Sequence, residues 1–321
     1  MGIHPAFADR FYLLEGIPSL QAAMADPELD RRIREYMEPP LGPAPDVATR
    51  DLTVDGPHGP VPVRLYEPPG EGTTRPALLW LHGGAFMFGD LDMPEADLTA
   101  REICTRAGAV VVSVDYRLAV GGVHHPVPLD DCVAAARWLR DSAADLGVDP
   151  ERFHLGGASA GGNLATATVL RLRDEDGWQP ASLVAIYPVL HPELPVPSAE
   201  VAEALDQVPP VLRFTPEATA VINANYLGGP PSLADGYSFP ALADVTGLCP
   251  TLLVVAEYDD LRTTGEAFGD QLEAAGVDVR RVLAESVLHG FLNLSADVEP
   301  VDRILAMMAT TVAHPTTVPA T

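Results

Sequence analysis

The stretch Gly157-Ala158-Ser159-Ala160-Gly161 decides the fold, because this G-x-S-x-G sequence directly follows an apolar run and directly precedes a helical pattern. Residues 152–157 (RFHLGG) read as a buried strand, and residues 160–175 read as a helix. A nucleophilic serine between a strand and a helix needs a tight, strained turn, and small neighbours let the two elements approach closely. The spacing differs from the G-x-G-x-x-G of a phosphate-binding turn. We therefore predict a nucleophile elbow with Ser159 as the nucleophile.

Apolar runs and helical patterns alternate on both sides of this turn. Most of the runs are nearly continuous, which is typical of parallel strands buried on both faces of a sheet. Strands are expected at residues 51–54, 61–66, 77–82, 109–116, 152–157, 182–188, 251–259 and 277–283. Helices are expected near residues 94–107, 127–145, 160–175, 263–275 and 298–312. This order predicts an α/β fold with a doubly wound, mostly parallel sheet of eight strands that opens with an antiparallel hairpin.

Two segments fall outside the alternation. Within residues 1–48, the run DPELDRRIREYM reads as a helix with Asp26 as its N-cap and Pro27 at the first helical position. An insertion, residues 190–241, separates two strands, holds nine prolines and contains a helical pattern near 216–226. We expect one domain over residues 1–321, in which residues 1–48 and the insertion form a helical cap. The cap should lie over the carboxyl ends of the strands, where open α/β sheets bind ligands.

A second glycine-rich turn, His82-Gly83-Gly84-Ala85-Phe86, directly follows an apolar run. Acyl transfer builds negative charge on a carbonyl oxygen, so an enzyme needs preorganised N–H donors at that oxygen. A glycine-rich turn offers backbone N–H groups without obstruction by side chains, and the residue after the nucleophile, Ala160, offers another. A plain β-turn would explain the motif alone, but together with the elbow it predicts an oxyanion hole.

The general base is expected at His289, in the L-H-G-F segment that follows the last strand. In α/β-hydrolases the nucleophile, the acid and the histidine follow in that chain order. The acid should stand at the end of the preceding strand, where Glu257, Asp259 and Asp260 are candidates. Side-chain alternation puts Glu257 and Asp259 on one side and Asp260 on the other, so the pattern alone leaves the acid open.

Composition disfavours several classes of function. The chain has 45 acidic and 20 basic residues, a formal net charge of −25, so its surface should repel nucleic acid and anionic membranes. All 20 basic residues are arginine, which excludes lysine chemistry such as Schiff bases and Ser-Lys dyads. The three cysteines are widely spaced and indicate neither disulfides nor a zinc site, and we expect no cofactor. Without a signal pattern or a long apolar run, a soluble cytoplasmic protein with no membrane insertion is expected.

Taken in order, these motifs resemble those of the hormone-sensitive-lipase-like esterases, the bacterial family IV of the α/β-hydrolase superfamily. The resemblance spans residues 76–291 and rests on HGGAF, DYRLA at 115–119, GASAGGNLA, IYP, AEYDDLR and HGF. It implies an α/β-hydrolase core with a helical cap and hydrolysis of short- to medium-chain carboxylic esters. It also implies Asp259 as the acid, because the family's D-P-L-R-D-E segment begins there. The implied oxyanion donors are the N–H groups of Gly84 with Gly83 or Ala85.

The sequence departs from the family pattern at several places. The H-G-G-G turn reads H-G-G-A, and the usually acidic residue before the serine is Ala158. The segment at 120–122 reads V-G-G in place of P-E-H, and the D-E pair of the acid segment reads T-T at 263–264. None of these changes removes a member of the triad. They alter its surroundings and the pocket, and hence the substrate more than the reaction.

The sequence thus predicts a serine carboxylesterase that acts on a small-molecule ester through an acyl-enzyme on Ser159. The expected pocket wall consists of aromatic residues: Phe86, Phe88, Tyr187 and, in the cap, Phe11 and Tyr12. An amidase or formamidase with the same triad is the alternative, since ester and amide hydrolysis use the same groups. A non-catalytic ligand-binding module on the same fold is disfavoured, because such a module would lose His289. A homodimer is an expectation from the resemblance alone.

Overall fold

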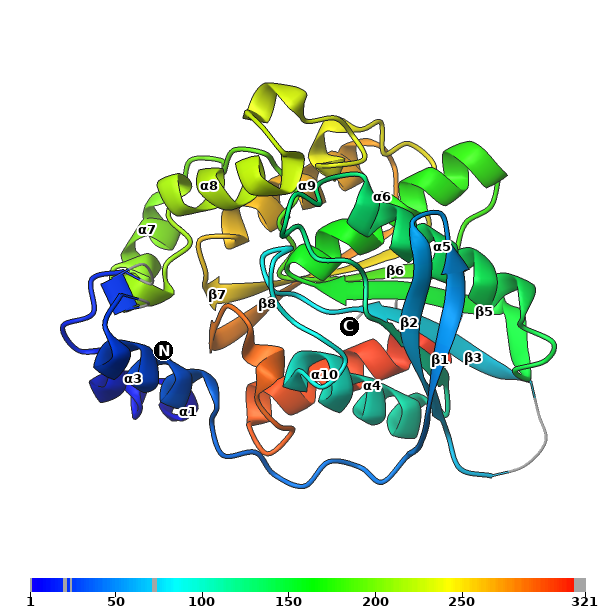
Figure 1. Ribbon diagram of the computed structural model, residues 1–321, viewed down its shortest axis with the longest axis horizontal. Helices are drawn as coiled ribbons and strands as arrows, with labels where there is room; N and C mark the ends of the chain where they lie inside the picture. Colours follow the sequence, from blue (N-terminus) through cyan, green and yellow to red (C-terminus); the bar gives the residue numbers. More distant parts are fainter. Residues whose placement is uncertain (1, 20–21, 24, 71–73, 315–321) are drawn as a thin grey trace.

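The computed structural model describes residues 2–19, 22–23, 25–70 and 74–314, and in these ranges eight strands form one sheet (Figure 1). The strands are β1 Ala48–Gly56, β2 Gly59–Glu67, β3 Arg75–Leu81, β4 Val110–Val114, β5 Val148–Ala158, β6 Ser182–Ile186, β7 Thr251–Tyr258 and β8 Val279–Leu288. Their order across the sheet is β1-β2-β4-β3-β5-β6-β7-β8. β2 runs antiparallel to both β1 and β4, and all other neighbours are parallel. The predicted hairpin and mostly parallel sheet are confirmed.

The central strands are apolar along nearly their whole length because both faces of the sheet are covered. Every residue of β4 and β6 is buried, and in β3 only Arg75 is partly exposed. In the register, Leu79 of β3 lies opposite Val112 of β4 and Leu155 of β5. Branched side chains therefore pack in rows across the sheet, which explains why the sequence shows continuous apolar runs here.

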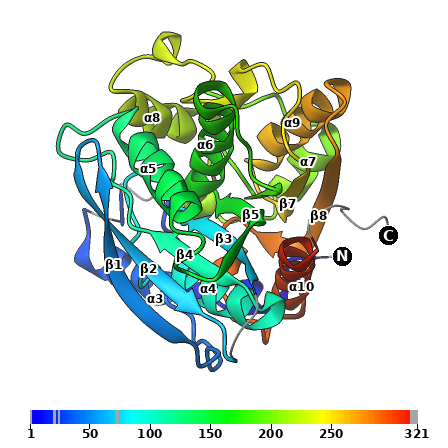
Figure 2. The ribbon, with the colours of Figure 1, turned by 90° about the vertical axis from the view of Figure 1, so that its right-hand side faces the viewer.

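Helices cover each face of the sheet, as Figure 2 shows. α4 (Pro94–Ala107) and α10 (Glu299–Ala313) lie on one face, and α5 (Val127–Asp141), α6 (Ala160–Asp176) and α9 (Arg262–Ala274) lie on the other. Each layer has its own apolar core. Leu164 of α6 and Phe268 of α9 belong to one core, and Ile103 of α4 and Ile304 of α10 belong to the second. This is the doubly wound α/β arrangement that the element order predicts.

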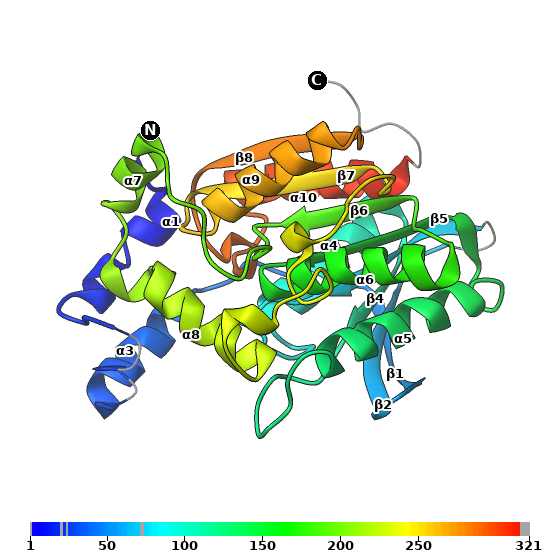
Figure 3. The same cartoon turned by 90° about the horizontal axis from the view of Figure 1, so that it is seen from above.

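Two segments far apart in the sequence lie side by side beyond the carboxyl ends of the parallel strands (Figures 1 and 3). The N-terminal segment holds α1 (Pro5–Ala8), a 3-10 turn (Phe11–Leu14) and α3 (Pro27–Met37); the insertion holds α7 (Ala199–Leu205) and α8 (Pro216–Leu227). An apolar cluster joins them: Leu13, Ile33 and Tyr36 pack with Val211 and Leu212. The backbone N–H of His4 also donates to the carbonyl oxygen of Ser286 in β8, at 2.8 Å.

The element boundaries follow local sequence signals where these are strong. α3 begins as predicted, because Oδ1 of Asp26 accepts the backbone N–H of Glu28 at 2.9 Å. β8 continues to Leu288, past the predicted end at 283, because an edge strand exposes alternate side chains and is not a continuous apolar run. α7 was not predicted, and α5 ends before the predicted 145. Short 3-10 turns span Pro210–Leu212, Pro231–Leu233, Pro240–Leu242 and Phe291–Asn293. No helix in the described ranges has the length and apolar character needed to cross a bilayer.

Replacing Leu155 by Ala should destabilise the fold by about 2–5 kcal/mol, because this fully buried side chain of β5 fills space between close-packed neighbours. Urea unfolding measures the change in the free energy of unfolding. Leu283→Ala is the matched control, since Leu283 lies on the edge strand β8 and is 36% exposed. Its truncation should cost much less. Equal losses at both positions would contradict the packing described here.

Candidate active site

Ser159 stands in the turn between β5 and α6, in a backbone conformation that few residues adopt. Its φ of 55° and ψ of −119° correspond to a strain on the order of 1–3 kcal/mol. Two glycines make the turn sterically possible. A Cβ at Gly157 would lie 2.3 Å from the carbonyl oxygen of Gly161, and a Cβ at Gly161 would lie 2.1 Å from that of Leu81. Strand and helix meet so closely that any larger residue would collide with backbone.

Three side chains from separate turns meet at this elbow. Nε2 of His289 lies 2.9 Å from Oγ of Ser159, and Nδ1 of His289 lies 2.7 Å from Oδ2 of Asp259. Asp259 directly follows β7 and His289 directly follows β8, so the sheet brings both to the same edge. Asp259 is 2% exposed, and its Oδ1 accepts the N–H of Leu261 at 2.9 Å. In this chain of hydrogen bonds the carboxylate orients the imidazole. The imidazole can then take the proton of the hydroxyl and make it a nucleophile.

The three acidic candidates for the end of β7 have different partners. Asp259 is bonded to the imidazole, as the family resemblance implies. Glu257 accepts the backbone N–H of Ser286 at 2.6 Å, and Asp260 forms an ion pair with Arg213 at 2.8 Å. The tertiary structure thus distinguishes the roles of three carboxylates, which side-chain alternation alone could not do.

The surroundings of His289 favour its protonated form. Burial of the ring disfavours the charge, but the charge and the hydrogen bond of Asp259, together with the charges of Glu95 and Asp260, outweigh burial and raise the pKa of His289 above its ordinary value. A base with a raised pKa takes a proton more readily, and its cationic form is stabilised once it has done so.

Two aromatic rings contact the imidazole. The ring of Tyr187, directly after β6, lies 4.9 Å from that of His289 between centroids, and the ring of Phe214, in the insertion, lies 4.6 Å from it. Both rings are tilted by 61° to the imidazole. Of the predicted cap residues, Phe11 packs on the cluster of the N-terminal segment and also on the core cluster that contains Tyr187, whereas Tyr12 is 61% exposed. The contact of the insertion with the base is therefore made by Phe214, which the sequence pattern did not single out.

The turn after β3 lies directly against the elbow. A Cβ at Gly83 would be 3.1 Å from Cβ of Ser159. The N–H of Gly83 donates to Oε1 of Glu95 at 2.6 Å, so the expectation that Gly83 donates to a substrate oxygen is corrected. In the described part of the chain, the N–H groups of Gly84, Ala85 and Ala160 have no protein acceptor. These three groups are available to an oxyanion.

The turn after β3, residues 82–86, is itself strained; we call it the oxyanion turn because the sequence predicts an oxyanion hole there. Gly84, Ala85 and Phe86 have φ angles of 115°, 54° and 62°. Glycine adopts such angles freely, but an alanine in this left-handed region costs about 1–2 kcal/mol. Ala85 occupies the position where the resembling family carries its third glycine, so this departure has an energetic cost that the surrounding structure must offset.

Glu95 is a residue of the site that the sequence motifs missed. It lies in α4 and is 1% exposed; Oε1 accepts the N–H of Gly83 and Oε2 accepts the O–H of Tyr187, both at 2.6 Å. Burial raises the pKa of Glu95, while the two hydrogen bonds and nearby His289 act in the opposite direction. The carboxyl group links the oxyanion turn to Tyr187 and, through that ring, to His289. The sequence signal that could have identified Glu95 is its position: it is a charged residue on the buried face of the helix predicted at 94–107.

The predicted pocket residues occupy different surroundings. Phe86 is fully buried and stacks on Tyr226, with 3.8 Å between ring centroids. Tyr187 is also fully buried, where it supports the base. Phe88 is 55% exposed. Of the three, Tyr187 is the one whose ring contacts a triad member.

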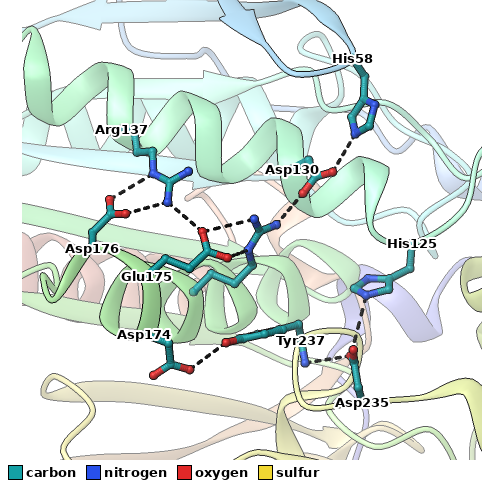
Figure 4. Close-up of polar contacts among 10 residues, drawn as sticks. His58, His125, Asp130, Arg137, Asp174, Glu175, Asp176, Asp235 and Tyr237 are labelled. Atoms are coloured by element: carbon teal, nitrogen blue, oxygen red, sulfur yellow. Dashed lines mark hydrogen bonds and ion pairs between the residues drawn. The ribbon is translucent and has the colours of Figure 1, made fainter.

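A cavity of about 530 Å³ lies away from the triad, between the β1–β2 hairpin, α5 and α6. Several charged side chains of its lining are already paired: Figure 4 shows Arg137 against Asp176 and Asp130 against His58, and Arg171 forms an ion pair with Asp130. Charges neutralised in this way offer a polar ligand little attraction. Among the described residues, no cluster of His, Cys, Asp and Glu side chains could hold a metal ion.

Glu95→Gln should lower kcat by on the order of 10- to 100-fold with little change in KM, because a misaligned oxyanion turn weakens binding of the transition state but not of the substrate. Steady-state kinetics on a chromogenic ester measure both constants. Glu102→Gln is the control: Glu102 lies on the same helix and pairs with Arg106 at 2.7 Å, away from the triad. Wild-type kcat in the Glu95 variant would show that the turn does not need this carboxyl group.

Comparison with known proteins places the chain in a family. Residues 78–293 match the family model described as alpha/beta hydrolase fold. The chain is 36% identical to the esterase LipI of Mycobacterium tuberculosis, over 82% of this chain and 80% of LipI. It is 35% identical to the carboxylesterase NlhH of the same organism, over 88% of each chain. The solved structure of a hyperthermophilic esterase from the archaeon Pyrobaculum calidifontis matches with a TM-score of 0.79 and 30% identity, over 98% of both chains. The protein therefore belongs to the hormone-sensitive-lipase-like esterases of the alpha/beta hydrolase fold.

Proposed function

We propose that this protein is a serine carboxylesterase, with Ser159 as nucleophile, His289 as general base and Asp259 as the acid that orients the base. The observation that carries the proposal is the continuous hydrogen-bonded chain from Oγ of Ser159 through both ring nitrogens of His289 to Asp259. Unpaired backbone N–H groups lie beside the hydroxyl, where acyl transfer needs them. The names of the relatives LipI and NlhH support the same class of activity.

The reaction follows from this geometry. Nε2 of His289 takes the proton of Ser159 as Oγ bonds to the ester carbonyl carbon, and the N–H groups of Gly84, Ala85 and Ala160 hold the oxyanion. The imidazole then gives the proton to the departing alcohol, which leaves an acyl-enzyme. Water deprotonated by the same imidazole releases the carboxylic acid. Asp259 keeps Nδ1 protonated and stabilises the imidazolium throughout.

The substrate in this proposal is a small ester with a short- to medium-length acyl chain. Ser159 is only 7% exposed, and the N-terminal segment and the insertion lie beyond the strand ends (Figure 3), which supports a cap over the serine. A substrate must reach the serine through this cover, which favours compact molecules over polymers. An amidase or formamidase would use the same groups, so the test below includes an amide.

Ser159→Ala should abolish hydrolysis of p-nitrophenyl esters, reducing kcat by about 10⁶-fold or to background, because no other group can form the acyl-enzyme. The assay uses an acyl series from acetate to palmitate together with p-nitroacetanilide as the amide. Wild type should prefer the shorter esters over both the palmitate and the amide. A folded wild type that cleaves the anilide and no ester would replace the esterase proposal with the amidase.

The pH dependence of kcat/KM should report His289. The imidazole must be neutral to accept a proton, so activity is lost as the pH falls through its pKa, which is raised above the ordinary value of 6.5. Asp259→Asn removes the main carboxylate that raises this pKa, so the acid limb should move to lower pH and kcat should drop by about 10⁴-fold. Glu257→Gln is the control and should leave the midpoint in place. An acid limb that stays put in Asp259→Asn would contradict the assigned pair.

A further inference from the structure

Asp260, the neighbour of the triad acid, makes a bidentate ion pair with Arg213 of the insertion. Nε of Arg213 donates to Oδ2 at 2.9 Å and Nη2 donates to Oδ1 at 2.8 Å. The backbone N–H of Phe214 also donates to Oδ2, at 2.9 Å. Nη1 of Arg213 reaches the carbonyl oxygen of Leu205, the last residue of α7, at 2.9 Å. One carboxylate therefore fastens the insertion to the turn that follows β7.

This attachment determines which part of the insertion meets the base. The backbone of Phe214 is bonded to Asp260, and its ring lies 4.6 Å from that of His289. The carboxylate and the imidazole come from the ends of neighbouring strands, β7 and β8. The position of the Phe214 ring is therefore coupled to the ion pair through a single residue of backbone.

We propose that the Asp260–Arg213 pair is a latch that holds Phe214 against His289 and so limits the size of the alcohol part of the ester; this rests on the proposed esterase function. The imidazole protonates the departing alcohol, so the alcohol part of a bound ester must lie near Nε2 of His289. A bulky ring fixed beside the imidazole excludes large groups from that space. Asp260 and Arg213 act through Phe214 and are positioning residues.

The environment of the pair suits this role. The side chain of Asp260 is 7% exposed and that of Arg213 is 23% exposed. A partly desolvated pair with two parallel hydrogen bonds fixes orientation more strictly than a surface pair, and a guanidinium is the group whose shape matches a carboxylate in this way. In the resembling family the residue after the acid is proline, which has no acceptor side chain.

The test compares acetates whose alcohols increase in size: ethyl, cyclohexyl and 1-naphthyl acetate. The variants are Phe214→Ala, the double variant Asp260→Asn/Arg213→Met, and the triple combination. The double variant removes both charges together and leaves no buried ion unpaired. Phe214→Ala and the double variant should each raise kcat/KM for naphthyl relative to ethyl acetate on the order of tenfold, the scale of a changed contact in an apolar pocket. The triple variant should not exceed Phe214→Ala.

Glu200→Gln is the matched control for the kinetics. Glu200 of α7 pairs with Arg262 of α9 at 2.8 Å, so it also joins the insertion to the core, but its side chain is 75% exposed. This variant should keep the wild-type alcohol preference. An unchanged preference in the double variant would overturn the latch. So would a triple variant whose change is the product of the other two, because the pair would then not act through Phe214.

Amide hydrogen exchange of residues 211–215 tests the latch with no ester present. Exchange should be faster in the double variant than in wild type and unchanged in Glu200→Gln, with melting temperatures recorded for each protein. Equal exchange in all three would overturn the latch even if the enzyme is active. A folded wild type that cleaves no ester would overturn the proposed function and with it the limit on the alcohol, while the exchange result would still decide whether the pair holds the insertion.

Discussion

The backbone conformation of Ser159 is the constraint on which the rest of the site depends. Its positive φ is tolerated because Gly157 and Gly161 let α6 begin in contact with the sheet. Gly161 packs directly on the carbonyl oxygen of Leu81, the last residue of β3. The same contact therefore fixes where the next turn starts and places its N–H groups beside the serine. The close approach of β3, β5 and α6 thus positions both the nucleophile and the oxyanion turn. The surrounding sheet stabilises the strained backbone of Ser159.

Two carboxylates support the base from different parts of the molecule. Glu95 binds the hydroxyl of Tyr187, and Asp260 binds the backbone of Phe214; the two aromatic rings both contact His289. The first connection lies within the core and also reaches the oxyanion turn. The second belongs to the insertion. Glu95 and Tyr187 are thus attached to the core around the sheet. Phe214, the group proposed to limit the alcohol, belongs to an insertion that can vary without disturbing the sheet.

Much of the fold could be predicted because its signals are local. A continuous apolar run marks each central strand, Asp26 and Pro27 mark the start of α3, and the glycines around Ser159 mark the elbow. Chain order then pointed to His289.

What could not be predicted depends on contacts between distant segments. The partner of Gly83 is a glutamate on a helix, and Phe214 reaches the imidazole only because the insertion folds back over the strand ends. No spacing in the sequence encodes such contacts, and the predicted strand ended at 283 because exposed residues alternate with covered ones along residues 281–285 of the edge strand β8.

The packing of the N-terminal segment on the insertion has a consequence for how the chain is made. Leu13 and Ile33 leave the ribosome well before Val211 and Leu212, which share their cluster. The acceptor for His4, the carbonyl of Ser286, is made later still. Closing so long a loop has a high entropic cost until the sheet between its ends has formed. The segment that holds Leu13 and Ile33 therefore docks late although it is synthesised before the sheet, and its apolar side chains stay uncovered in the meantime, when a nascent chain is most prone to aggregate.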